Sequence, residues 1–160
     1  MNLNKKWYFI LILLLASLAV WWFFFKRTSK QASKLPTAKN SFEEKLFFRK
    51  DLTNEQKMFL RAVAMHETGK YSSTLFKQAN NAFGMRPNQF RTKWYDGVTS
   101  GNYARYSDFN ASINDVKEWM DKYIGGVPVD ENGVDLMKQK GYFEDTLMNY
   151  KTAVSKYMQA

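Results

Sequence analysis

Two kinds of hydrophobic pattern divide the chain. Residues 7–25 (WYFILILLLASLAVWWFFF) form an apolar run of nineteen residues in which Ser17 is the only polar one. As an α-helix with a rise of about 1.5 Å per residue, this run would be about 28 Å long, close to the hydrocarbon thickness of a bilayer. Basic residues flank the run, and aromatic residues lie near both of its ends, as is typical of membrane interfaces. The pattern predicts a transmembrane anchor.

A cleaved signal peptide is the alternative, with residues 17–19 (Ser-Leu-Ala) as the cleavage site. Cleavage there would leave the apolar residues 20–25 exposed at a new N-terminus, so an uncleaved anchor is the preferred interpretation. The charges next to the anchor mildly favour a cytoplasmic location for the rest of the chain, because more basic residues follow the run than precede it.

Residues 26–42 are polar and basic, and Pro36 interrupts any regular structure. This composition predicts a tether, which could also lie against anionic lipid head groups. The predicted organisation is an N-terminal flank (residues 1–6), a transmembrane anchor (7–25), a basic tether (26–42) and one compact domain (43–160).

Beyond residue 52, apolar residues recur at helical spacing. Thr53 and Gln56 have the spacing of a capping box, and the helix that they begin should end near Gly69, with Glu67 in its last turn. A short helix should follow Ser72 and Ser73 and continue through Ala79, and Gly84 and Pro87 prevent its extension.

The remaining pattern predicts one irregular lobe followed by three helices. Residues 87–111 are rich in turn-forming and aromatic residues, which favours an irregular lobe with a short hairpin. Ser112 and Asp115 should begin the next helix, and residues 125–126 (Gly-Gly) should end it. A short helix is expected at residues 134–140 and a last one from about residue 144. The domain is therefore expected to be mainly helical.

The charge of the chain is unevenly distributed. The net charge is +9, yet residues 1–40 carry seven basic and no acidic residues, whereas the other 120 carry 17 basic and 15 acidic ones. A nucleic-acid-binding domain normally concentrates positive charge on its folded face, so no specific nucleic acid is expected as a partner. Binding of nucleic acid through residues 26–50 is the weaker alternative.

Metal and thiol chemistry are poorly supported. The chain has no cysteine and a single histidine, His66, which excludes disulfides, thiolate metal sites and multi-histidine sites within one chain. His66-Glu67 begins like a zinc-protease helix, but Lys70 stands where that motif has its second histidine. Neither a metal nor another cofactor is expected.

Residues 66–86 (HETGKYSSTLFKQANNAFGMR) concentrate the candidate chemistry. Cleavage of a glycosidic bond requires a proton donor, usually a carboxylic acid kept protonated by apolar surroundings. Glu67 fits this requirement because Ala64, Met65 and the aromatic residues that follow can provide those surroundings. The amides of Asn80 and Asn81 could hold sugar hydroxyl and acetamido groups.

This stretch resembles the glucosaminidase branch of the lysozyme-like superfamily, which hydrolyses bacterial peptidoglycan. That family typically shows Glu-Ser-Gly-Trp-Gly-x-Ser and then Asn-Asn-Leu-Phe-Gly-Ile-Lys, and this chain has ETGKYSS and then NNAFGMR. Similar elements follow in order: a Tyr-Arg-x-Tyr element (here YARY, 103–106), a helix start (112–115), and a Gly-Tyr-Ala-Thr-Asp segment with a later tyrosine (here GYFED, 141–145, and Tyr150). The resemblance covers about residues 53–158.

The resemblance implies a mainly α, lysozyme-like α+β fold and a set of site residues. It makes Glu67 the general acid and places Tyr106 in the cleft near the reacting sugar. The substrate-binding residues that it implies are Ser73, Asn80, Asn81, Phe83, Gly84 and Tyr103.

One departure from the family pattern concerns the second carboxylate. Many members carry a second glutamate some thirty to forty residues after the first, and this chain has none there. An inverting hydrolase needs a base to activate water, and Asp96, in the loop 94–97, is the candidate. Without such a base, either the substrate's own acetamido group assists or the enzyme is a lytic transglycosylase that uses Glu67 as both acid and base.

The resulting expectation is a membrane-anchored enzyme that cleaves peptidoglycan glycan strands and contacts the bilayer through residues 7–25. It would serve cell-wall remodelling, with the domain facing the periplasm and the wall, an orientation that conflicts with the charge preference described above, or phage-type wall penetration from the membrane of a lipid-containing virion. The alternative is a catalytically inactive relative that binds glycan or has a structural role.

Overall fold

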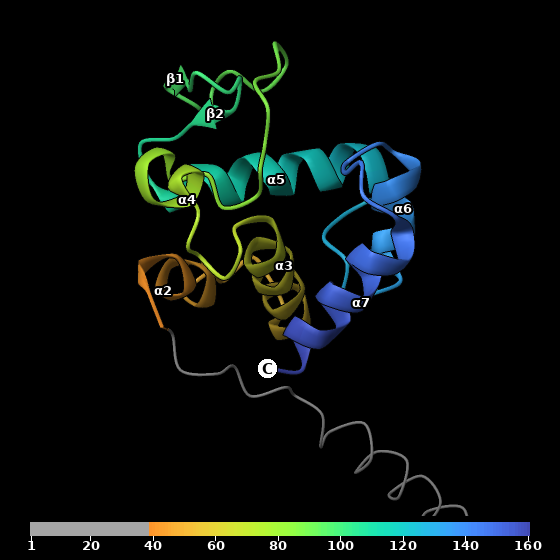
Figure 1. The fold of residues 1–160 in the computed structure, drawn as a ribbon. Coiled ribbons are helices and arrows are strands. Elements are labelled where there is room, and N and C mark those ends of the chain that lie inside the picture. The colour runs from red at the N-terminus through yellow and green to blue at the C-terminus, as the bar shows by residue number, and fades with distance from the viewer. Residues whose placement is uncertain (1–38) are drawn as a thin grey trace, which may run out of the picture. The chain divides into compact units, whose positions relative to one another are not determined.

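The computed structural model describes residues 39–160, in which helices predominate and a small two-stranded sheet forms part of one lobe (Figure 1). The predicted anchor at residues 7–25 and most of the predicted tether lie outside the described residues. Within residues 39–160, none of the helices combines the length and the apolar character needed to cross a bilayer. The elements are α2 (Ser41–Phe47), α3 (Asn54–Glu67), α4 (Thr74–Ala79), β1 (Gly97–Val98), β2 (Ala104–Arg105), α5 (Phe109–Ile124), α6 (Gly133–Gln139) and α7 (Leu147–Met158).

Helix α3 begins and ends where the sequence predicts. The Thr53 side chain accepts a hydrogen bond from the backbone N–H of Gln56, and the Gln56 side chain accepts one from the backbone N–H of Thr53, so the capping box is complete. The helix ends at Glu67, and the backbone turns away at Gly69, where φ is +55°. Glu67 therefore lies in the last turn of α3, as predicted.

Helix α5 begins three residues earlier than the sequence predicted. Asp108 is its N-cap and accepts a hydrogen bond from the backbone N–H of Ala111 at 3.0 Å. Ser112 and Asp115, which were expected to begin the helix, are fully buried inside it. That prediction was wrong because a buried serine and aspartate look like capping residues until their tertiary partners are known. The predicted end, at Gly125 with φ of +83°, is confirmed.

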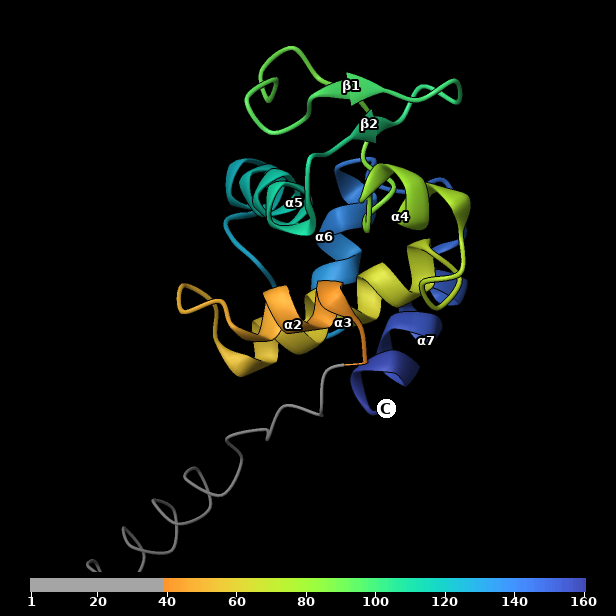
Figure 2. The ribbon, with the colours of Figure 1, turned by 90° about the vertical axis from the view of Figure 1, so that its left-hand side faces the viewer.

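The predicted irregular lobe contains the expected hairpin. Strands β1 and β2 are antiparallel, with Gly97 opposite Arg105 and Val98 opposite Ala104. In both views the hairpin lies beyond α4 and α5, away from α3 and α7 (Figure 2). The backbone N–H of Ala104 donates to the carbonyl of Met85 at 2.9 Å, so the lobe is attached to the segment that follows α4.

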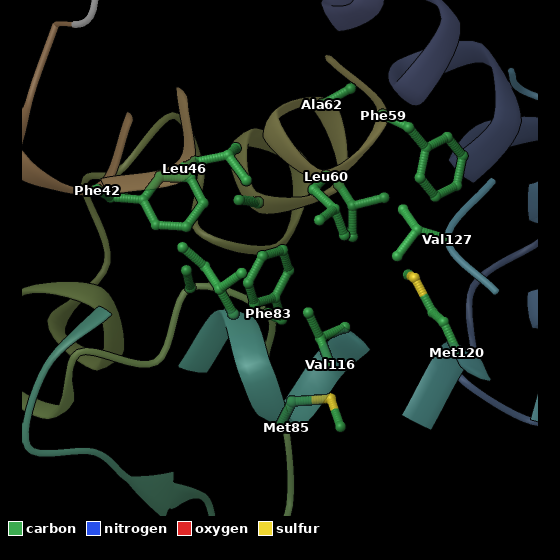
Figure 3. Close-up of a cluster of buried hydrophobic side chains, with 14 of the residues drawn as sticks. Phe42, Leu46, Phe59, Leu60, Ala62, Phe83, Met85, Val116, Met120 and Val127 are labelled. Carbon is green, nitrogen blue, oxygen red and sulfur yellow. The ribbon is translucent and has the colours of Figure 1, made fainter. Parts of the chain in front are cut away.

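One core joins α2, α3, α5 and the segment after α4. Phe42, which the sequence assigned to the tether, is fully buried on α2 and packs against Phe83 with ring centroids 5.7 Å apart. Figure 3 shows this group of side chains, contributed by elements far apart in the sequence: Phe42, Leu46, Phe59, Leu60, Ala62, Phe83, Met85, Val116, Met120 and Val127. Packing against the core fixes the Phe83 backbone next to the end of α3.

A buried ion pair connects α2 with α3. The Arg61 Nε atom donates to Glu43 Oε1 at 2.8 Å, and neither side chain is exposed to solvent. The Tyr71 hydroxyl also donates to Glu43 Oε1, and Arg61 Nη1 donates to the carbonyl of Tyr157 in α7. Helices α3 and α7 pack directly against each other. Arg61 therefore links α3, which carries Glu67, both to α2 and to α7, which carries Tyr150.

Candidate active site

A cleft of about 620 Å³ opens beside the C-terminal end of α3. The lining consists of the end of α3 with His66 and Glu67, Leu75 of α4, residues 83–88 with Arg91, the aromatic residues Tyr103 and Trp119, and residues 141–145 together with Tyr150. Segments more than 80 residues apart in the sequence thus face the same space. The cleft contains the residue expected to act as the acid.

Glu67 is partly buried in the wall of this cleft. Burial raises the pKa of its carboxyl group, because the charged form loses hydration, and a hydrogen bond from Tyr150 acts in the opposite direction. The Tyr150 hydroxyl donates to Glu67 Oε1 at 2.7 Å. The net shift is upward, which keeps a proton on this carboxyl group to a higher pH than on an exposed glutamate.

Tyr150 is fixed by the rings on either side of it. The Phe143 ring stacks on it with centroids 3.8 Å apart and an interplanar angle of 10°. The His66 ring meets it edge-on at 4.4 Å. Burial raises the pKa of Tyr150 well above its usual range, so its hydroxyl keeps its proton and can donate to Glu67.

Gly84 lies against the other oxygen of the Glu67 carboxyl group. Its φ is +63°, and a Cβ atom added there would lie 3.0 Å from Glu67 Oε2. The Asn81 side chain holds this turn: its Oδ1 accepts hydrogen bonds from the backbone N–H groups of Phe83 and Met85, and its Nδ2 donates to the carbonyls of Met85 and Ala104. Glu67 is therefore enclosed by Tyr150 on one oxygen and by Gly84 on the other.

Substitution of Gly84 by alanine should impair both stability and activity. The left-handed backbone conformation costs a non-glycine residue about 1–2 kcal/mol, and the new methyl group would press on Glu67 Oε2. We expect glycan cleavage to fall at least about tenfold, because small displacements of a reacting group reduce rates steeply. Thermal unfolding and the initial rate of cleavage measure the two effects separately.

Gly125→Ala is the matched control for that substitution. Gly125 also has a positive φ, +83°, but no atom lies within 4 Å of the position that its Cβ would take, and it is outside the cleft. It should lose similar stability and keep full activity per folded molecule. Equal activity losses in the two variants would show that the contact with Glu67 is unimportant.

Phe83, Gly84 and Tyr103 line the cleft, as expected of substrate-binding residues. The Phe83 side chain, however, is 1 % exposed and packs in the core, so its backbone borders the cleft more than its ring does. The Arg86 guanidinium lies over the Tyr103 ring at 4.7 Å from its centroid. These two exposed or half-exposed side chains form one wall that a ligand can reach.

Tyr106, which the family resemblance placed in the cleft near the reacting sugar, does not line it. Its side chain is 2 % exposed, and its hydroxyl donates to Asp115 Oδ2 at 2.6 Å. Arg91 Nε donates to the other oxygen of Asp115 at 2.6 Å. The structure corrects the expected position of Tyr106: it lies in a buried network that joins the lobe to α5.

Asp96, the candidate base, also lies outside the cleft lining. It is half-exposed and pairs with Arg105 across the hairpin at 3.1 Å. Ser73 is the N-cap of α4, and Asn80 ends that helix in a left-handed conformation and donates to the carbonyl of Tyr106. Asn81 is fully buried. Each of these four residues has an internal partner, and none borders the cleft.

The structure adds residues that the sequence reasoning did not select as site residues. Tyr150 contacts Glu67 directly, and the Tyr142 hydroxyl donates to the carbonyl of Phe83 at 2.9 Å. Both tyrosines belong to the late segment that resembles the family pattern, so that resemblance could have identified them as site residues. His66 lines the cleft, and burial lowers its pKa, against a smaller opposing effect of Asp145.

Within residues 39–160, no three acidic, histidine or cysteine side chains are placed to hold a metal ion together.

Comparison with models of protein families matched residues 52–160 to the glucosaminidase family, described as mannosyl-glycoprotein endo-beta-N-acetylglucosaminidase. No curated protein matched the chain. No solved structure matched it either. The matched region contains α3, the cleft and every residue that lines it, and the chain belongs to the glucosaminidase family.

Proposed function

We propose that this chain cleaves the glycan strands of peptidoglycan, with Glu67 as the general acid. Membership of the glucosaminidase family supports a glycosidase that acts on this polymer. The observation that carries the assignment to Glu67 is its environment: a carboxyl group with a raised pKa, in the wall of an open cleft, held by Tyr150. A carboxyl group with a raised pKa keeps its proton to a higher pH and can protonate a leaving oxygen.

The two oxygens of Glu67 have different roles in this proposal. Oε1 accepts the hydrogen bond from Tyr150, which fixes the orientation of the carboxyl group. Oε2 faces Gly84, where the absence of a side chain leaves room for a sugar to approach. The proton on Oε2 passes to the glycosidic oxygen as the bond between that oxygen and the anomeric carbon breaks.

The aromatic and basic side chains in the cleft lining suit a sugar polymer. Tyr103 and Trp119 offer aromatic surface, and Arg86 is an exposed cation over the Tyr103 ring. Sugar rings pack on aromatic faces, and the acidic groups of peptidoglycan stems complement an arginine side chain. Tyr103 and Arg86 are therefore proposed to bind substrate.

We further propose that residues 7–25 anchor the enzyme in a membrane and that residues 26–42 tether the domain beside it. This places cleavage next to a bilayer, either at the periplasmic face of a cell or on the membrane of a lipid-containing virion. Protease protection of the domain in intact cells, and a search for the protein in purified particles, distinguish the two locations.

Mass spectrometry of digested peptidoglycan tests the activity. Purified sacculi are incubated with the full chain in detergent, and the released fragments are analysed. Reducing N-acetylglucosamine ends indicate an endo-β-N-acetylglucosaminidase, reducing N-acetylmuramic acid ends a muramidase, and 1,6-anhydro ends a lytic transglycosylase. Binding of the sacculi without any new ends would contradict the proposal and favour a glycan-binding protein without turnover.

A further inference from the structure

A second carboxylate faces the cleft from the loop between α6 and α7. Glu144 lines the same cleft as Glu67 and is exposed to solvent. Its backbone carbonyl accepts a hydrogen bond from Lys138, but within residues 39–160 its side-chain carboxylate has no hydrogen bond or ion pair. The group is therefore available to a water molecule or a substrate.

Hydrogen bonds from one lysine side chain hold the backbone around Glu144 in place. Lys138 Nζ donates to the carbonyls of Phe143, Glu144 and Asp145 at 3.3, 3.1 and 2.8 Å. The Phe143 ring stacks on Tyr150, which donates to Glu67. Glu144 thus directly follows Phe143, whose ring stacks on Tyr150, and Tyr150 is the hydrogen-bond donor to Glu67. Such support positions a reacting group better than a free loop does.

The other candidate carboxylates are already engaged. Asp145 Oδ1 accepts hydrogen bonds from the backbone N–H of Thr146 at 2.6 Å and from Asn149 at 3.4 Å. Asp96 pairs with Arg105 outside the cleft. Asp115 is buried in α5 between two donors. Three of the described carboxylates line the cleft: Glu67, Glu144 and Asp145. Of these, Glu144 is the one whose side chain has no hydrogen bond or ion pair among the described residues.

The sequence departs from the family pattern at position 144. The family pattern has Gly-Tyr-Ala-Thr-Asp where this chain has GYFED, so a glutamate stands at 144 in place of a threonine. The same chain lacks the second glutamate that many members carry in the lobe. The chain therefore lacks a glutamate in the lobe and has an additional one in the segment 141–145, which lines the cleft.

We propose that Glu144 is the catalytic base of this enzyme. The inference rests on the proposed function and assigns its second reacting group. Glu144 takes a proton from water, the water oxygen bonds to the anomeric carbon, the bond from that carbon to the glycosidic oxygen breaks, and the leaving oxygen takes the proton of Glu67. The reaction inverts the configuration at the anomeric carbon, as expected when acid and base act on opposite faces of the sugar.

Glu144→Gln tests this role in the full chain, with purified peptidoglycan as substrate. We expect kcat for reducing-end release to fall by about 10²–10⁴-fold, the usual contribution of a general base, with little change in KM or melting temperature. Azide should restore turnover in this variant and yield a glycosyl azide, because azide needs no base to attack. A merely structural role of Glu144 would give no rescue.

Two further variants complete the experiment. Glu44→Gln removes an exposed glutamate on α2, outside the cleft, and should retain wild-type kcat. Glu67→Gln should be inactive with or without azide, because the leaving oxygen still lacks its proton. If Glu67→Gln is inactive but Glu144→Gln keeps the wild-type rate, or if the products carry 1,6-anhydro ends, Glu144 is not the base and the proposed function still stands. An inactive wild-type enzyme would overturn both.

Discussion

Replacement of Glu67 by glutamine is expected to lower the rate of glycan cleavage by about 10²–10⁴-fold, the contribution of a positioned general acid. Glutamine has nearly the same shape and can still accept the Tyr150 hydrogen bond, but its amide cannot protonate a leaving oxygen. The initial rate of reducing-end or anhydro-end release from purified sacculi measures the effect. Asp96→Asn is the matched control, because Asp96 lies outside the cleft and should be dispensable for turnover.

The same variant should be folded and, at neutral pH, more stable than the wild type. Because burial raises the pKa of Glu67 in the folded state, the folded protein holds this proton more tightly than the unfolded chain does. The stability linked to that proton is fully present below the unfolded pKa and is lost as the pH rises through the folded pKa. Glutamine cannot ionise, so the difference between the two melting temperatures should widen from acid to neutral pH. A variant that is inactive and also unfolded would leave the acid role unsupported.

The pH dependence of the rate should show the same group. Because the reaction needs a protonated Glu67, the rate falls as the pH rises through the pKa of this carboxyl group, which forms the alkaline limb of the profile. Tyr150→Phe removes the hydrogen bond that lowers this pKa, so the alkaline limb should move to higher pH while the maximal rate falls. An unchanged limb in Tyr150→Phe would mean that another group controls the profile.

Arg61→Met is expected to destabilise the fold by about 3–5 kcal/mol, because it leaves the Glu43 carboxylate buried without its charged partner. Both side chains are fully buried, and the pair lies at the contact of α2, α3 and α7. Thermal or denaturant unfolding measures the loss. Arg61 lies outside the cleft, so the fraction that remains folded should cleave glycan at the wild-type rate.

Two companion variants show whether the burial of the unpaired Glu43 charge causes the destabilisation in Arg61→Met. Lys151→Met breaks an ion pair of similar length, 2.7 Å against 2.8 Å, with the partly exposed Asp135, and should cost at most about 1 kcal/mol. The double variant Arg61→Met with Glu43→Gln removes both charges, while the amide oxygen can still accept from Tyr71. It should recover much of the lost stability. A double variant as unstable as Arg61→Met alone would assign the effect to lost packing of the long side chain.

Local sequence signals predicted the ends of helices correctly where both partners of an interaction are near each other in the chain. The capping box of Thr53 and Gln56 spans one helical turn, and it placed α3 and with it Glu67. Gly125 ended α5 through its own backbone conformation. The same kind of signal gave a wrong start for α5 at Ser112 and Asp115, because serine and aspartate occur both as helix caps and as buried polar residues. What distinguishes them is a distant partner: Arg91 and Tyr106 for Asp115.

By itself, the sequence determined the family, the mainly helical character of the domain and the position of Glu67 at the end of a helix. Only the tertiary structure decided what surrounds that carboxyl group. Tyr150 is 83 residues away in the chain, and it reaches Glu67 because α7 packs against α3. Glu144 lines the cleft beside them, whereas Asp96 pairs with Arg105 and the Tyr106 hydroxyl donates to Asp115. The physical reason is that the pKa of a carboxyl group and its access to a ligand depend on burial and on partners in space. Spacing along the chain specifies neither.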